Sequence, residues 1–181
     1  MKGVVFTEFL DLVENRFGLE TVERVLDAGQ TATNGAYTAV GTYDHRELLR
    51  MVVQLATETG LPVSALVKAF GGHLFDVFRD GYPGVLESSR STFEFLPSVE
   101  QAIHVEMRKL YPDAELPDFE YERSGDDSLT VVYRSSRPFA DLAEGLIEAC
   151  IRHYGDDLQV AREDLPPFDG TSARFTLTRR R

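Results

Sequence analysis

Three polar side chains occupy alternate positions in the segment Val-Val-Tyr-Arg-Ser-Ser-Arg-Pro: Tyr133, Ser135 and Arg137. Side chains alternate between the two faces of an extended chain, so these three donors are expected to point the same way. Pro138 disfavours the α-helical region for Arg137, which favours an extended backbone up to that residue. A guanidinium fork beside two hydroxyl groups offers bidentate, charge-assisted hydrogen bonds and additional neutral donors. The motif therefore predicts a site that binds carboxylates.

His104 lies upstream of this motif, on a segment whose apolar residues recur at helical spacing. Taken alone, a histidine beside such a stripe is more often a core residue than a metal ligand. Taken alone, Arg137 could equally be a surface arginine of an acidic protein. Together, a histidine that could ligate a metal and a carboxylate clamp suggest haem, which carries an iron atom and two propionate groups.

The composition is that of an ordinary soluble globular protein of one domain, with 181 residues, of which 43% are hydrophobic and 27% charged. A formal net charge of −11 disfavours nucleic acid and anionic membranes as partners. The sequence shows neither an apolar run of membrane-spanning length nor a secretory signal pattern, so we expect a cytoplasmic location. The single cysteine, Cys150, excludes an internal disulfide and is expected to be an inert core residue.

The first part of the chain, to about residue 111, is predicted to be helical from its apolar spacing. Helices are expected over residues 6–17, 22–29, 44–60 and 65–78, with a connecting loop over residues 30–43. Gly18 is expected to end the first helix, and Asp44 with Glu47 resembles a capping box. Gly71 and Gly72 interrupt the longest apolar stripe, which indicates close approach by a neighbouring group or a bend.

The remainder, about residues 112–181, is predicted to combine strands with one long helix. Residues 119–123 and 129–135 flank a Ser-Gly-Asp-Asp turn and predict a hairpin. Pro138 is expected at the first position of a helix that runs to Tyr154. Residues 159–162 and 173–177 predict a second strand pair. The expected fold is α+β: a helical N-terminal part packed on a four-stranded antiparallel sheet with one long helix, and a cofactor held between them.

Over nearly its whole length the sequence resembles the haem nitric oxide/oxygen binding (H-NOX) family, which is related to the haem domain of soluble guanylate cyclase. The resemblance is carried by the Tyr-x-Ser-x-Arg motif, the helix Ile-His-Val-Glu-Met-Arg-Lys-Leu-Tyr-Pro around His104, the opening Met-Lys-Gly and the helical stretch Glu-Gly-Leu-Ile-Glu at residues 144–148. It implies that His104 ligates the iron of haem b, that Tyr133, Ser135 and Arg137 hold the propionates, and that Pro117 packs against the macrocycle and bends it.

The resemblance also implies an apolar wall on the opposite, distal side of the haem, made of Val5, Phe9, Leu74, Phe78, Leu142 and Leu146. On this interpretation the group that approaches Gly71 and Gly72 is the haem or the His104 helix. Oxygen-binding relatives place a tyrosine at the position of Leu142, so we expect binding of nitric oxide and carbon monoxide but no stable binding of oxygen.

The function implied by the resemblance is a nitric oxide sensor without catalysis of its own. Nitric oxide would weaken or break the bond between His104 and the iron, and the His104 helix would move relative to the sheet. A partner enzyme, typically a sensor histidine kinase or a cyclic-dinucleotide enzyme, would respond to that movement. The sequence shows no arrangement typical of hydrolytic or phosphoryl-transfer enzymes.

Three alternatives remain open at this stage: a peroxidase-like haem enzyme, an oxygen- or redox-responsive haem protein, and a carrier of haem or of another amphipathic acid. An enzyme would need a distal acid or base, whereas a carrier would not depend on His104. The other histidines are not expected to ligate a metal. We expect His45 and His153 to face solvent, and His73 to lie near the site without binding the iron.

Overall fold

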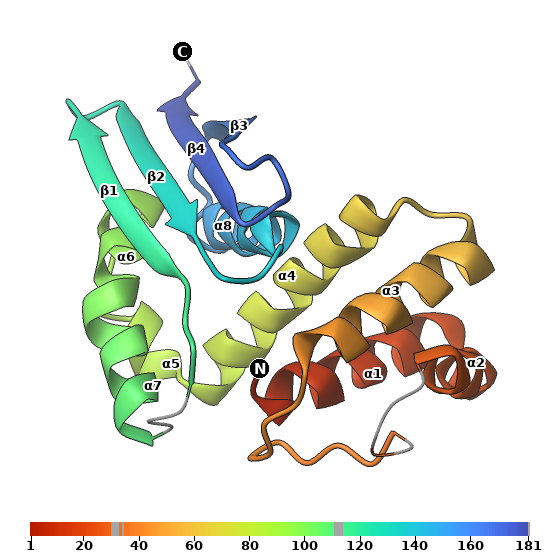
Figure 1. Ribbon diagram of the computed structural model, residues 1–181. Coiled ribbons are helices and arrows are strands. Elements are labelled where there is room, and N and C mark those ends of the chain that lie inside the picture. The colour runs from red at the N-terminus through yellow and green to blue at the C-terminus, as the bar shows by residue number, and fades with distance from the viewer. Residues whose placement is uncertain (30–32, 34, 111–113, 181) are drawn as a thin grey trace.

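The computed structural model describes residues 1–29, 33, 35–110 and 114–180, and the side chains of all of these except residues 83, 85, 101, 102, 106 and 110. Its N-terminal part contains four long helices: α1 (Gly3–Phe17), α2 (Leu19–Gly29), α3 (His45–Thr59) and α4 (Val63–Gly81). These elements confirm the predicted helical N-terminal part (Figure 1).

Local sequence signals explain where these helices begin and end. Gly18 ends α1 with a φ of 87° and Gly60 ends α3 with a φ of 70°, conformations that favour glycine. The carboxylate of Asp44 accepts a hydrogen bond from the Arg46 backbone N–H at 3.0 Å and caps α3. The predicted capping box is only half formed, because the Glu47 carboxylate accepts instead from the hydroxyl group of Tyr37 at 2.8 Å.

Short helices connect α4 to the sheet, and the sequence patterns left most of them unassigned. They are α5 (Pro83–Leu86), α6 (Thr92–Ser98), a π-helical turn (Val99–His104) and α7 (Val105–Leu110). The Ser91 hydroxyl group caps α6 by accepting from the Glu94 backbone N–H at 3.3 Å. The π-helical turn ends at His104, and such turns occur frequently at functional sites.

The C-terminal part is an antiparallel sheet with one long helix, as predicted. Its strands are β1 (Asp118–Ser124), β2 (Ser128–Arg134), β3 (Leu158–Asp164) and β4 (Ser172–Arg179), in the spatial order β1-β2-β4-β3. The long helix, α8 (Ala140–Tyr154), begins at Ala140 rather than at Pro138. Pro138 lies instead in the bend between β2 and α8. Phe139, the residue after it, is the N-cap of α8.

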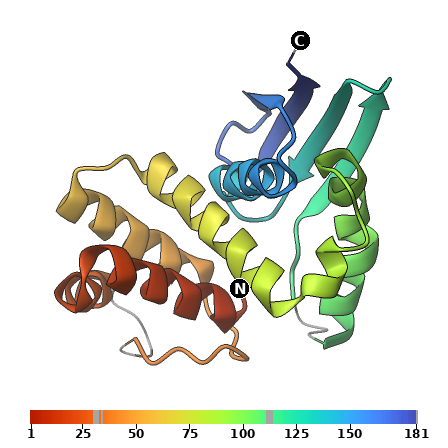
Figure 2. The ribbon, with the colours of Figure 1, turned by 180° about the vertical axis from the view of Figure 1, so that it is seen from behind.

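Two hydrophobic cores hold these parts together. One lies among α1 to α4, and the other lies between the sheet, α6 and α8. Leu146 of α8 packs against both cores. Figure 2 shows α4 running between the N-terminal helices and α8, so α4 and α8 join the two halves of the molecule. Among the described residues, no single helix is long and apolar enough to span a membrane, and α3 with α4 passes that test only as a pair bent by 114°.

The α4–α8 crossing corrects one expectation about the glycine pair. A Cβ atom on Gly71 would collide with the Leu142 carbonyl oxygen and lie 3.0 Å from the Cα atom of Gly145. The group that approaches Gly71 is therefore the backbone of α8, and the prediction of haem or the His104 helix was wrong. The apolar stripe on α4 indicates that one face is covered, but a single helix does not identify the element that covers it.

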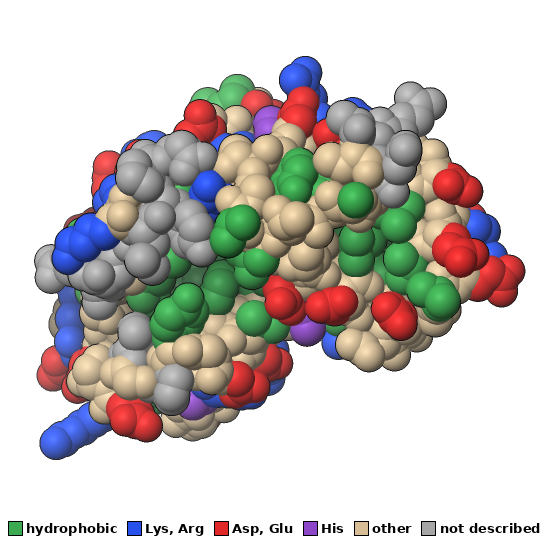
Figure 3. All heavy atoms as spheres, turned by 90° about the horizontal axis from the view of Figure 1, so that it is seen from below, with side chains coloured by type: hydrophobic (Ala, Val, Ile, Leu, Met, Phe, Trp, Pro, Cys, Tyr) green, Lys and Arg blue, Asp and Glu red, His purple; other side chains and the backbone are tan. Residues whose placement is uncertain are grey.

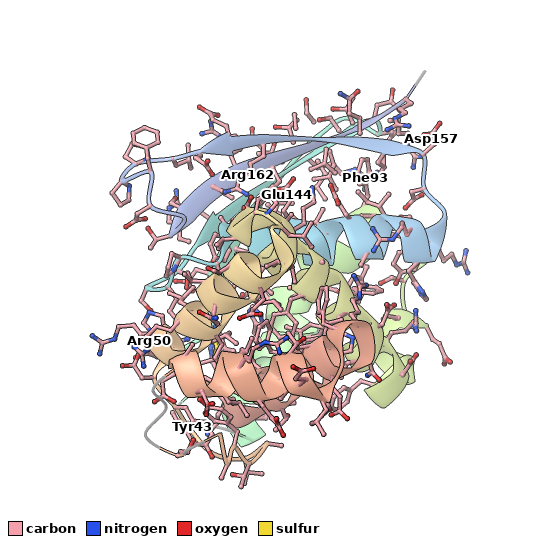
Figure 4. The ribbon with its side chains drawn as sticks, turned by 90° about the vertical axis from the view of Figure 1, so that its right-hand side faces the viewer. Tyr43, Arg50, Phe93, Glu144, Asp157 and Arg162 are labelled. Carbon is pink, nitrogen blue, oxygen red and sulfur yellow. The ribbon has the colours of Figure 1, made fainter. Side chains whose placement is uncertain are left out.

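Charged side chains reinforce the same crossing. Lys68 of α4 forms ion pairs with Glu144 at 2.8 Å and with Glu148 at 2.7 Å, both on α8. Arg162 of β3 bonds to Glu144 at 2.9 Å, and Figure 4 shows the labelled Arg162 and Glu144 side by side between the sheet and α8. Glu144 thus receives hydrogen bonds from both sides, and this links α4 through α8 to the sheet.

Candidate functional site

His104 is buried at the end of the π-helical turn, with 8% of its surface exposed. Its Nδ1 atom lies 2.8 Å from Glu100 Oε2, one turn earlier. Within the described part of the chain, the His104 hydrogen bond is made by Nδ1 and not by Nε2. An imidazole whose Nδ1–H group donates to a carboxylate keeps its lone pair on Nε2, and this is the form that binds metal ions.

Glu100 is in turn held by a second partner. Its Oε1 atom accepts a hydrogen bond from Arg108 Nη2 at 2.9 Å. Partial burial opposes ionisation of this carboxyl group, but the hydrogen bonds from His104 and Arg108 outweigh that effect and lower the pKa of Glu100. The carboxylate is therefore ionised at neutral pH and accepts a hydrogen bond from the Nδ1–H group. The sequence analysis missed Glu100, although its spacing of four residues from His104 is a usable signal.

The carboxylate clamp is formed by a bend and not by a continuous extended segment. Strand β2 ends at Arg134, so the prediction of an extended chain to Arg137 was wrong. The Arg137 backbone N–H donates to Ser135 Oγ at 3.1 Å, and the Tyr133 hydroxyl group donates to the Arg137 carbonyl oxygen at 3.3 Å. Burial raises the pKa of Tyr133, so its hydroxyl group keeps its proton and stays a donor. The bend still brings the three motif residues together.

The Arg137 side chain is only 12% exposed and already binds a carboxylate of the chain. Its Nη2 atom lies 2.6 Å from Glu115 Oε2, and Nη1 donates to the Glu115 backbone carbonyl at 2.8 Å. Burial and, to a smaller extent, the positive charge of Arg137 lower the pKa of His45. No local pattern identified Glu115, because it lies 22 residues away from Arg137.

One aromatic ring connects the candidate ligand to the clamp. The Phe119 ring centre lies 5.8 Å from that of His104 and 5.7 Å from that of Tyr133. Pro117, two residues earlier, is half-buried, and Glu115 lies on the same short segment before β1. The segment from Glu115 to Phe119 therefore contacts both His104 and the clamp, although these are far apart in sequence.

Most of the predicted apolar wall comes together in the N-terminal core. Phe9 and Leu74 are buried there, and Val5, Leu142 and Leu146 pack against the same core. Phe78 is 36% exposed and is not a member of that core. Figure 3 shows hydrophobic side chains in a hollow on the half of the molecule that carries α5 to α7 and β1, and a further group over the N-terminal helices.

The other histidines differ in their surroundings. His73 Nε2 lies 3.1 Å from Glu8 Oε2, and His153 is exposed as expected. His45 is half-buried beside Phe139, with ring centres 6.3 Å apart, so the expectation that it faces solvent was wrong. Within the part of the chain that the structure describes, no three His, Cys, Asp or Glu side chains form a group that could hold a metal ion.

The chemistry of this donor set fits haem. His104 provides an imidazole nitrogen, and Arg137, with the Tyr133 hydroxyl group nearby, provides the donors that carboxylates need. The Glu115 carboxylate on Arg137 shows that this guanidinium binds such a group. His104 and Arg137 therefore have the chemistry that a haem iron and its propionates require.

Comparisons with known proteins point to the same cofactor. A family model described as Haem-NO-binding matches residues 2–162. The crystal structure of an unliganded Fe(II) H-NOX protein from K. algicida is 39% identical and has a TM-score of 0.93, covering 100% of this chain and 97% of that chain. An H-NOX protein from Shewanella woodyi, solved in the Fe(II)CO state with IWP-051 bound, is 39% identical with a TM-score of 0.84, covering 99% and 95%.

A sequence relative among characterised proteins is much longer. Soluble guanylate cyclase 89Db of Drosophila melanogaster is 24% identical over 162 residues, which are 87% of this chain. The chain spans only 24% of the length of that cyclase.

Proposed function

The chain belongs to the haem-NO-binding (H-NOX) family, and from that membership we propose that it is a haem-based sensor of nitric oxide. Nitric oxide would weaken the His104–iron bond, and a partner signalling enzyme would respond to the resulting conformational change. The observation that carries this proposal is the contact of one segment, residues 115–119, with both a buried imidazole and an arginine that binds a carboxylate. Iron and propionates need those two groups.

Bound haem b would supply an iron that binds diatomic gases, and His104 would be the protein ligand of that iron. His104 would bind through Nε2, since Nδ1 is engaged by Glu100. Arg137, Tyr133 and Ser135 would hold the propionates, and Pro117 would press on one face of the macrocycle. The role of Arg137 is supported by its low exposure of 12%, because a desolvated guanidinium binds carboxylates more strongly than an exposed one.

Selectivity for nitric oxide and carbon monoxide over oxygen would come from the apolar wall. Phe9, Leu74, Leu142 and Leu146 carry no hydrogen-bond donor on their side chains. Bound oxygen accumulates negative charge and gains from such a donor, whereas nitric oxide does not need one. The Shewanella woodyi relative, solved with carbon monoxide, supports binding of diatomic gases at such a site.

The signal would travel from His104 into the fold. A change at His104 would act first on the π-helical turn, which contacts β1 through the His104 and Phe119 rings, and on α7, which follows the turn. Leu146 packs on both cores, and α4 crosses α8 without intervening side chains at Gly71 and Gly145. A change on one side of the haem would therefore shift the two halves relative to each other, provided that the gas binds the two arrangements with different affinity.

The partner is proposed to be a sensor histidine kinase or a cyclic-dinucleotide enzyme. The guanylate cyclase relative supports a partner of signalling type, since the matched region makes up 24% of that longer protein. The cytoplasmic location and the lack of catalysis stay predictions.

Absorption spectra of the purified ferrous protein under argon, nitric oxide, carbon monoxide and air test the proposal. We expect the spectrum to change with nitric oxide and with carbon monoxide, and air to give no persistent oxygen-bound spectrum. Hydrogen exchange should then show that nitric oxide increases amide exchange in residues 99–110. Purified protein that retains no haem, or unchanged exchange in this segment with nitric oxide bound, would contradict the proposal.

A further inference from the structure

Glu100, His104 and Arg108 form a line of hydrogen bonds along one side of the helical segment around His104. Glu100 Oε2 lies 2.8 Å from His104 Nδ1, and Glu100 Oε1 lies 2.9 Å from Arg108 Nη2. The exposed fractions of the side chains rise along this chain of contacts, from 10% for His104 to 30% for Glu100 and 44% for Arg108. The most shielded contact is thus the one to the histidine, where a hydrogen bond is strongest.

The π-helical turn helps to bring these three residues together. In a regular α-helix, residues eight positions apart are offset by about 80° beyond two full turns. A π-helical turn closes its hydrogen bonds at the fifth residue and winds more slowly, so it removes part of that offset. Val99–His104 is such a turn: it contains Glu100 and His104, and Arg108 follows it on α7. The irregular backbone therefore has a local consequence: it lets one carboxylate contact a residue four positions ahead and another eight positions ahead.

We propose that Glu100 is a positioning residue for His104: its carboxylate accepts a hydrogen bond from Nδ1–H, fixes the tautomer that presents Nε2, and strengthens the bond from Nε2 to iron. A carboxylate on the far nitrogen of a ligating histidine raises the basicity of the ligand. Arg108 limits this effect, because its guanidinium draws negative charge to Oε1 and leaves less on the oxygen that faces His104. The inference rests on the proposed function, in which His104 ligates the haem iron.

The regulatory consequence concerns how readily His104 is released. A stronger Nε2–iron bond needs more free energy from the gas before it breaks, so Glu100 would raise the threshold of the sensor and Arg108 would lower it. The Arg108 side chain is exposed, so an anion or a partner protein can bind its guanidinium. Arg108 would then withdraw less charge from Glu100, and Glu100 would accept a stronger hydrogen bond from His104.

Resonance Raman spectroscopy of the ferrous, haem-loaded protein tests this inference through the iron–histidine stretching frequency. We expect the frequency to fall in Glu100→Gln and to rise in Arg108→Gln. A purely structural role for Glu100 and Arg108 does not give shifts of opposite sign. Glu122→Gln is the matched control, because Glu122 is exposed on β1 and the change removes the same charge. The haem loss rate of Glu100→Gln should rise by about 10-fold.

The outcomes separate this inference from the proposed function. A wild-type protein without an iron–histidine band, or a band that persists in His104→Ala, refutes ligation by His104. If the wild-type band is present but Glu100→Gln shifts its frequency no more than the control Glu122→Gln, the role of Glu100 is refuted. Ligation by His104 is unaffected by that result. If Glu100→Gln does not retain haem, the exposed Arg108→Gln variant decides, and an unshifted band there overturns the inference.

Discussion

Gly71 of α4 and Gly145 of α8 meet backbone to backbone, such that a Cβ atom on Gly145 would lie 3.1 Å from the Cα atom of Gly71 and collide with the Lys68 carbonyl oxygen. This contact sets the distance between the helix that carries Leu74 and the helix that carries Leu142. Both leucines belong to the proposed apolar wall. The shape of that wall therefore depends on the absence of side chains at the two glycines.

Gly145→Ala should lower the free energy of unfolding by about 1–3 kcal/mol, because the added methyl group forces backbone shifts in a packed crossing. Urea denaturation followed by circular dichroism measures this change. Gly81→Ala is the control, since Gly81 lies at the end of α4 and a Cβ atom there would meet nothing within 4 Å. Equal stability of the two variants would contradict the close contact.

His104→Ala should give folded protein that retains haem poorly, because the proposed axial ligand is gone. Added imidazole should restore haem binding by occupying the space left by the side chain. The measurement is the haem-to-protein ratio after gel filtration, with and without imidazole. His73→Ala serves as the control, since His73 contacts Glu8. Full haem occupancy of His104→Ala without imidazole would refute the assignment.

Arg137→Lys should accelerate haem loss, although it keeps the positive charge, because lysine lacks the planar fork that binds carboxylates at two points. Transfer of haem to an excess of apomyoglobin gives the rate. Arg134→Lys is a matched control on the same segment: Arg134 is half exposed and pairs with Glu120 at 2.7 Å. Rates for Arg137→Lys, Tyr133→Phe and Ser135→Ala that all equal the wild-type rate would exclude a propionate clamp here.

Leu142→Tyr should shift the ferrous protein towards oxygen binding, because it adds a hydroxyl donor to a wall that otherwise lacks one. Leu142→Phe separates the two effects of this change, since it adds the ring without the hydroxyl group. Spectra are recorded after deoxygenated protein is mixed with air. Persistent oxygen binding in the wild-type protein, or an equal gain in Leu142→Phe, would show that a missing donor is not the cause of selectivity.

Glu144→Gln should reduce stability in a way that depends on pH. Burial opposes ionisation of Glu144, but hydrogen bonds from Lys68 and Arg162 outweigh it and hold the pKa below the ordinary value of 4.5. A lowered pKa in the folded state stabilises the protein above pH 4.5, and this contribution is lost as the pH falls through the folded-state value. The variant should therefore lose about 1–2 kcal/mol at neutral pH and progressively less in acid.

Urea denaturation of wild type and Glu144→Gln at several pH values between about 3 and 7 measures this difference. Glu122→Gln removes an exposed carboxylate from β1 and should show little dependence on pH. A stability difference for Glu144→Gln that stays constant over this range would mean that the ion pairs of Glu144 do not stabilise the folded state.

The sequence by itself determined the four long N-terminal helices, the long helix near the C-terminus and the two strand pairs. Apolar spacing reports which side of an element is buried, and glycines at positive φ report where helices end, as Gly18 and Gly60 do. These signals are local, so they were read correctly without knowledge of the fold. The order of Tyr133, Ser135 and Arg137 along the chain carries the family motif, and their role in holding propionates stays a prediction.

Only the tertiary structure decided which elements meet. The sequence indicated a close approach at Gly71 but not that α8 makes it, and it gave no reason to pair Arg137 with Glu115. Of the six residues expected in the apolar wall, Phe78 lies outside the N-terminal core with 36% of its surface exposed, and its role stays a prediction. Periodicity specifies a buried face, but the partner of that face depends on the packing of residues distant in sequence. The contact between Glu100 and His104 is partly readable from the sequence, because the two residues are four positions apart. Its geometry also depends on a π-helical turn, which the sequence pattern does not reveal.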